Sequence, residues 1–203
     1  MGGNKISYLA LKIFISAIGD YHILNTIKQK LKNPFSSNTF EFLLYKKNWI
    51  DTVQWHLEDI IRDPKIDPIN GISLKRRIDK SNQERTDLVE KIDDYYLALF
   101  SKVEPKEAAT LNTESPGWVV DRISILCLKI YHMNEQVIRN DVSAEHLNKC
   151  KNKLAVLLEQ QEDISTAFDQ LLTAYESGEK KIKVYRQMKM YNDDSLNPIL
   201  YKK

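Results

Sequence analysis

The sequence predicts an all-α bundle of about five helices. Apolar residues recur at helical spacing over long stretches, and no run alternates long enough to require a strand. Only 6 glycines and 6 prolines occur among 203 residues, and they cluster between the periodic stretches. Long helices joined by short connections form a bundle, because each helix must bury its apolar stripe against its neighbours.

The first two helices are bounded by prolines. We expect one helix from 5 to 32, because Pro34 disfavours the helical conformation in the residue before it. A second helix is expected from 38 to 62, where the prolines of "RDPKIDP" prevent its continuation. Both helices carry apolar residues at helical spacing on one face.

Turn and capping residues place the remaining three helices. The third is expected from 73 to 102, after an Asn-Gly turn dipeptide. The fourth, 116–139, follows Ser115 as N-cap and has proline in its first turn. It is apolar on nearly all sides, which predicts a central position. The long fifth helix is expected at 144–177, after Ser143.

Residues 1–178 are therefore predicted to form a single helical-bundle domain, and residues 179–203 a basic C-terminal extension. The extension contains "KKIKVYRQMKM" at 180–190, which interleaves basic with apolar and aromatic residues. One interpretation is that it docks on a protein partner. The alternative is a solvated helix end. Nucleic acid is an unlikely partner, because the net charge is only +2 and no recognised motif is present.

The N-terminal apolar stretch predicts no transmembrane segment. Lys12 interrupts it, and it is shorter than the ~20 residues that span a bilayer. We therefore expect a cytoplasmic protein. Cys127 and Cys150 lack the spacing of a metal knuckle or a redox pair, and both are predicted to be buried free thiols.

Polar groups interrupt the apolar faces of two helices. The stretch "SPGWVVDRISILCLKIYHM" carries charged residues and a histidine among its apolar ones. Arg85 falls on the apolar face of the third helix, while Asp87 lies opposite and is expected to face solvent. An unpaired charge in a core is very costly, so Arg85 requires a carboxylate partner. The candidate partners are Glu58, Asp59 and Asp121.

These polar residues predict a cavity shared by the second, third and fourth helices. Its tryptophans would stack on a base or a sugar, and its cations would bind phosphate or carboxylate. The alternative is a buried ion-pair network that fixes helix register and binds nothing. The candidate ligand-binding residues are Trp55, Glu58, Asp59, Asn82, Arg85, Trp118, Asp121, Arg122 and Lys129.

Catalysis has weaker support, and no catalytic residue is predicted. All-helical nucleotide pyrophosphohydrolases hold magnesium with carboxylates paired three residues apart on adjacent helices. Glu90 and Asp93 offer one such pair, whereas Glu58 and Asp59 are adjacent and diverge by about 100°. Magnesium is expected only under this alternative, and no other cofactor is predicted. The four histidines, at 22, 56, 132 and 146, do not have metal-ligand spacing along the sequence.

Four ordered blocks carry a resemblance to a known family. They are "DYH" at 20–22, "LLYKKNWIDTVQWHLEDIIRDP" at 43–64, "RIDKSNQERTDLVEKID" at 77–93 and "NTESPGWVVDRISILCLKIYHM" at 112–133. Over roughly residues 5–175 the chain resembles the bacterial family catalogued as domain of unknown function 4254. The resemblance implies a helical, cytosolic protein whose genes often lie near glycosyltransferase genes for envelope polysaccharides. It assigns no role to any residue.

The predicted function is therefore a binding module for a phosphate-bearing metabolite, such as a nucleotide or sugar nucleotide, linked to envelope polysaccharide metabolism. A protein–protein adaptor whose buried charges are purely structural is the alternative. A magnesium-dependent pyrophosphohydrolase-like enzyme is a further one.

Overall fold

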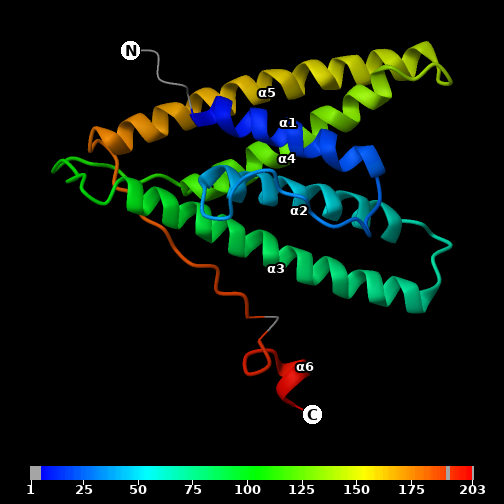
Figure 1. Cartoon of the computed structure of the whole chain (residues 1–203), viewed down its shortest axis with the longest axis horizontal. Coiled ribbons are helices and arrows are strands. Elements are labelled where there is room, and N and C mark those ends of the chain that lie inside the picture. Colours follow the sequence, from blue (N-terminus) through cyan, green and yellow to red (C-terminus); the bar gives the residue numbers. More distant parts are fainter. Residues whose placement is uncertain (1–5, 191–192, 203) are drawn as a thin grey trace.

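The computed structural model describes residues 6–190 and 193–202, and its fold is an all-α bundle (Figure 1). The described residues contain no β-strand, only one isolated parallel bridge between Thr110 and Lys180. The predicted fold class is therefore confirmed. The helices are α1 (Ile6–Leu24), α2 (Phe40–Ile61), α3 (Pro68–Leu99), α4 (Pro116–Val137), α5 (Ala144–Glu176) and the short α6 (Pro198–Tyr201).

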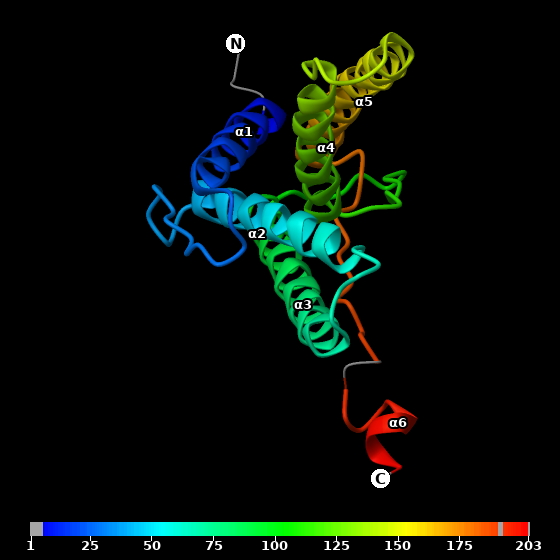
Figure 2. The same cartoon turned by 90° about the vertical axis from the view of Figure 1, so that its right-hand side faces the viewer.

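Helix α4 is the centre of the bundle. It packs against α1, α2, α3 and α5, and Figures 1 and 2 show it between these helices. Ile123 and Leu128 are fully buried, as expected for a helix that is apolar on nearly all sides. Helix α2 in turn packs against α1, α3 and α4. The interior between α2, α3 and α4 therefore receives side chains from all three.

Two helix boundaries differ from the prediction. Helix α1 ends at Leu24, well before Pro34, because Asn25 adopts a left-handed conformation with φ of 44°. Helix α3 begins at Pro68, because the Asp67 side chain accepts a hydrogen bond from the backbone of Asn70. The Asn-Gly dipeptide therefore lies inside the first turn of α3. The predicted start of the first helix at residue 5 lies outside the described residues.

The other caps follow the sequence closely. The Ser143 side chain accepts a hydrogen bond from His146 N, which starts α5. Gly178 follows the end of α5 with a φ of 72°, a conformation that favours glycine. Cys127 and Cys150 are buried and free, as predicted. Burial raises the pKa of the Cys127 thiol to about 12, so this thiol is not a reactive thiolate at neutral pH.

The basic extension is extended chain along α3, not a helix end. The Gln187 backbone N–H donates to Glu90 Oε1 at 2.9 Å. Lys189 Nζ donates to Thr86 Oγ1 at 2.6 Å. Arg186 pairs with Asp94. Beyond these anchors, α6 lies apart from the bundle in both views (Figures 1 and 2). Within the described chain, no helix combines the length and apolarity needed to cross a membrane.

Candidate functional site

A network of buried charges joins α2, α3 and α4. Lys47 is fully buried and pairs with Asp51 on its own helix. Its Nζ also lies 2.7 Å from Asp121 Oδ1. Arg85 donates from Nε to Asp51 Oδ1 at 2.6 Å and from Nη2 to Asp121 Oδ1 at 3.1 Å. Two cations therefore meet two carboxylates, and every charge has an opposite partner. The Ser124 hydroxyl also donates to Asp51.

The electrostatics favour the ionised state of this network. Burial opposes ionisation of Asp121, but attraction and hydrogen bonds from Lys47 and Arg85 outweigh it and hold its pKa below the usual value. Burial likewise disfavours the charged form of Arg85, and its two carboxylate partners outweigh that effect and raise its pKa. The geometry fits the predicted alternative of an ion-pair network that fixes helix register.

Two members of the network differ from the sequence prediction. Asp121 was expected as a partner of Arg85, and it is one. Asp51 was not among the predicted partners of Arg85, yet it is buried and accepts from Arg85 Nε. Lys47 was missed. Its signals were four-residue spacing to Asp51 and apolar neighbours in "LLYKKNWID".

The predicted single cavity was also wrong, because its residues divide among several cavities. One of them, of about 760 Å³, lies between α2, α4 and α5, and we call it the Trp55 cavity. Lys129 is exposed and lines this cavity, whereas Arg85 does not line it. The lining residues of the Trp55 cavity are Trp55, Asp59, Lys129, His132, Met133, Glu135, Gln136, Asn152, Lys153, Val156, Leu157 and Gln160.

Two smaller cavities border Arg85. One, of about 410 Å³, is also lined by Trp55, Glu58 and Asp59. The other, of about 340 Å³, is lined by Asn82, Trp118 and Asp121, together with Gln187 and Lys189 of the extension. Arg122 is exposed, lines neither of them and pairs with Glu114.

The acidic pair suggested for magnesium does not converge. Asp93 is buried, and it accepts hydrogen bonds from Ser115 Oγ at 2.7 Å and from Gly117 N at 2.6 Å. Burial raises the pKa of Asp93, although these two hydrogen bonds oppose the shift. Glu90 instead accepts from the Gln187 backbone. Each carboxylate is therefore committed to a different partner, and Asp93 positions the start of α4.

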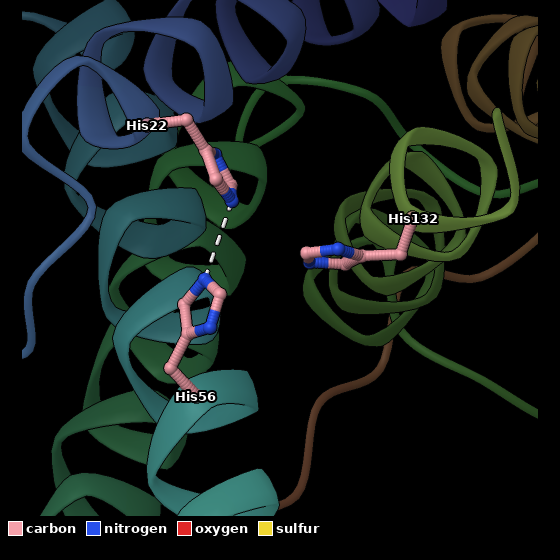
Figure 3. A group of neighbouring side chains, drawn as sticks. All are labelled: His22, His56 and His132. Atoms are coloured by element: carbon pink, nitrogen blue, oxygen red, sulfur yellow. Dashed lines mark hydrogen bonds between the residues drawn. The ribbon is translucent and has the colours of Figure 1, made fainter. Parts of the chain in front are cut away.

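Three histidines from three helices meet between those helices, and each is half-buried. His22 on α1, His56 on α2 and His132 on α4 point their rings toward one another (Figure 3). One ring nitrogen of each lies within 4.8 Å of those of the other two. The Nε2 atoms of His22 and His56 are 3.2 Å apart. Among the described residues, this is the group of histidine, cysteine and acidic side chains placed to hold a metal ion. Sequence spacing did not reveal it, because each histidine comes from a different helix.

Hydrogen bonds fix the orientation of two of these rings. His22 Nδ1 donates to the Ile18 carbonyl at 2.7 Å, because a carbonyl can only accept. His132 Nδ1 lies 2.7 Å from Glu135 Oε2 and donates to that carboxylate. The remaining nitrogen of His132, Nε2, is buried and has no hydrogen-bond partner. In the neutral rings of His22 and His132, Nε2 therefore carries a lone pair.

Aromatic rings surround the histidines. Trp55 stacks on His132 with ring centroids 4.8 Å apart, and Tyr21 stacks on His56 at 5.2 Å. Burial lowers the pKa of both His22 and His56, and the neighbouring imidazoles lower that of His56 further. His132 also lines the Trp55 cavity, so the cluster and the cavity share one side chain.

Fold and site together define a class: an all-α bundle with a paired-charge interior and a three-histidine cluster beside a cavity. The chain belongs to the family described as protein of unknown function (DUF4254), whose model matches residues 41–184. Comparison with curated proteins and with solved structures gives no match. The matched region holds the whole charge network, His56 and His132. It omits α1, and with it His22 and the "DYH" block.

Proposed function

We propose that this protein binds a small phosphate-bearing metabolite, such as a nucleotide or a sugar nucleotide, in the Trp55 cavity. One observation carries the proposal: Lys129 and Lys153 line this cavity beside the Trp55 indole, and neither has an ion-pair partner within the described ranges. An indole offers a flat surface to a base or sugar, and an ammonium group pairs with phosphate.

The unpaired state of these lysines is what distinguishes them from the other candidate cations. Arg85 already binds two carboxylates, and Arg122 is paired with Glu114. A ligand phosphate would have to displace those partners. Lys129 and Lys153 can instead form charge-assisted hydrogen bonds with a phosphate without breaking any contact.

The rest of the cavity suits a ligand of this size and polarity. A volume of about 760 Å³ lies in the range of small-molecule sites. Met133, Val156 and Leu157 form an apolar part of the cavity wall. The asparagine and glutamine side chains of the lining can form hydrogen bonds with sugar hydroxyls and with the polar edge of a base. Of the two carboxylates, Glu135 is engaged by His132. Asp59 remains available to accept hydrogen bonds from sugar hydroxyls.

Thermal shift followed by calorimetry against nucleotides and sugar nucleotides tests the proposal. Family resemblance suggests a link to envelope polysaccharide metabolism, so sugar nucleotides belong at the head of the panel. Each charged hydrogen bond contributes about 1.5–3 kcal/mol, so Lys129→Met is expected to weaken binding roughly 10- to 100-fold. The control is Lys151→Met, which removes a lysine of α5 that does not line the cavity and should leave ligand binding unchanged. No shift of the wild type at millimolar ligand would overturn the proposal.

Two results would favour the alternatives. A wild type that binds no metabolite, with its charge network intact, favours the adaptor interpretation, which the pairing of every charge in that network supports. Magnesium-dependent release of pyrophosphate, lost in Glu90→Gln, would favour the pyrophosphohydrolase interpretation. The separate commitments of Glu90 and Asp93 count against that interpretation.

A further inference from the structure

We propose that His22, His56 and His132 form a binding site for a divalent d-block cation, with zinc as the occupant to be tested. The inference does not depend on the proposed metabolite. It rests on the convergence of three imidazoles from three helices, shown in Figure 3, and on the hydrogen bonds that orient them.

The geometry is close to that of a bound ion. Zinc binds imidazole nitrogen at about 2.0–2.1 Å, so two such ligands in tetrahedral geometry lie roughly 3.4 Å apart. The Nε2 atoms of His22 and His56 are already 3.2 Å apart. The three nitrogens all lie within 4.8 Å of one another. No pair therefore has to close by more than about 1.4 Å to complete the triangle.

The outer hydrogen bonds are those of metal-ligating histidines. Such residues usually donate their second ring N–H to a carbonyl or a carboxylate, which orients the ring. His22 does so to Ile18 O, and His132 to Glu135. Both rings therefore keep the Nε2 lone pair for the centre of the cluster. These two outer hydrogen bonds are separate from the close spacing of the inward-facing nitrogens, so they support a metal site independently of that spacing.

The cluster is unsatisfied without an ion. His132 Nε2 is buried and unpartnered, and an unsatisfied buried polar atom destabilises the fold. Because His22 Nε2 carries a lone pair, the His56 Nε2–H group donates to it in the contact between the two rings. When a cation binds, the His56 proton moves to Nδ1, so that all three Nε2 lone pairs face the ion. This change of tautomer releases no proton.

The ligand set selects the class of metal. Imidazole nitrogen suits zinc, copper, iron and nickel, whereas magnesium and calcium require oxygen ligands. Three protein ligands leave a coordination position for water or another ligand. Because His132 also lines the Trp55 cavity, a bound cation would lie beside that cavity.

Calorimetry on the full chain after chelator treatment is the first test. We expect one zinc per chain and a raised melting temperature, with no effect of magnesium. Cobalt is the spectroscopic probe: tetrahedral nitrogen ligation gives visible d–d bands without the near-ultraviolet charge transfer of a cysteine ligand. A wild type that binds no zinc, or cobalt spectra with a thiolate band, would overturn the proposal. Neither measurement requires a variant to fold.

Variants then assign the ligands. His56→Gln and His132→Gln are each expected to lower zinc affinity by at least about 100-fold, because even outer hydrogen-bond partners contribute 10- to 100-fold. The matched control is His146→Gln, which removes the fourth histidine, placed 3.3 Å from Cys150 and outside the cluster. Loss of binding in His146→Gln, with binding retained in the cluster variants, would place the metal elsewhere and refute the assignment. Zinc binding is measured without metabolite, so its outcome is separate from that of the proposed function.

Discussion

Both α2 and α4 contribute side chains to two polar clusters, and the clusters differ in how their groups are partnered. In the charge network, Lys47 and Arg85 face Asp51 and Asp121, so each charge meets its opposite. In the histidine cluster, ring nitrogens face one another, and one of them has no partner. The first cluster is stabilised by the chain alone, whereas the second would gain from a group that the chain does not supply.

This difference shows that a binding site is better recognised by polar groups that lack a partner in the chain than by residue type. A buried arginine attracts attention in a sequence because charges are costly to bury. Once Arg85 is paired, however, it offers a ligand little. Histidines attract less attention, since a single buried histidine is often structural. Ring nitrogens that converge from three helices, one of them without a hydrogen-bond partner, are a stronger indication of a binding site.

The largest expected effect is on stability, from breaking the charge network. Lys47→Met leaves Asp51 and Asp121 with one buried cation instead of two. Removing one partner of a buried pair typically costs about 3–5 kcal/mol. We expect a loss of that size in the free energy of unfolding, measured by urea denaturation.

The chain contains a matched control for this prediction. Lys75 and Asp79 on α3 form an ion pair with the same four-residue spacing as Lys47 and Asp51, but their side chains are 61% and 43% exposed. Lys75→Met is expected to cost no more than about 0.5 kcal/mol. Equal losses in the two variants would mean that burial of Lys47 does not set its contribution, and the contrast between the two clusters would then lose its basis.

The next effect concerns the approach of α4 to α3, which brings Asp121 within reach of Arg85. A Cβ on Gly117 would meet the Val89 carbonyl and lie 2.8 Å from Asp93 Cγ. Gly117→Ala is therefore expected to cost about 1–3 kcal/mol of stability, in the range of overpacked sites. Gly19→Ala, with nothing within 4 Å of the added Cβ, should be neutral or stabilising by up to about 1 kcal/mol.

Gly117→Ala also separates the two clusters. Gly117 lies in the first turn of α4, and His132 lies near its other end. Zinc affinity should therefore change much less than stability. A large loss of zinc binding in a variant that remains folded would show that the clusters are coupled through α4.

A third prediction addresses the histidine cluster through its carboxylate. Glu135→Gln removes the charge that accepts from His132 Nδ1. We expect zinc affinity to fall about 10- to 100-fold while stability of the metal-free protein changes little, because Glu135 is exposed. Calorimetry measures the first quantity and urea denaturation the second. Glu145→Gln, at an exposed glutamate paired with Lys149, should leave zinc affinity unchanged.

Local sequence signals were enough to predict the fold. The Ser143 side chain caps α5 by accepting from His146 N, a signal that involves only neighbouring residues. Ser115 occupies the N-cap position of α4 as predicted, but its hydroxyl donates to Asp93 on α3 and does not cap the helix. Errors arose where tertiary contacts decided the result. Helix α2 was assigned one apolar face, yet it packs against three helices, and so Asp51 is buried on a second side. Periodicity alone does not indicate how many sides of a helix are covered.

The candidate site was only partly predictable for a related reason. Arg85 and Asp121 were identified because a buried charge requires a partner. Lys129 was predicted to share a cavity with Arg85, but it is exposed and lines a different one, since periodicity cannot locate the ends of long side chains. The histidine cluster lay beyond sequence reasoning, because metal-ligand spacing is informative within one element. Contacts among α1, α2 and α4 are set by packing.

The smallest expected effect is on the loss of unfolding free energy at acid pH. Measuring it tests the charge network without removing either cation. Lys47, Asp51 and Arg85 face Asp121, and the two cations hold its pKa below the usual value despite burial. A carboxyl with a depressed pKa in the folded state stabilises the fold above its unfolded pKa of about 3.9. That contribution is lost as pH falls through the folded value, because the unfolded chain takes up the proton first.

Asp121→Asn is therefore expected to be less stable than wild type at pH 7 and to lose less stability between pH 4 and pH 2. Urea denaturation across that range measures both. Asp141 is the control, because hydrogen bonding by Arg139 also lowers its pKa, but on the surface. Solvent screens that pair, so Asp141→Asn should leave the slope nearly unchanged. If stability fell equally steeply with pH in the two variants, the buried network would contribute no more than a surface pair. Its charges would then not stabilise one another as the contrast with the histidine cluster requires.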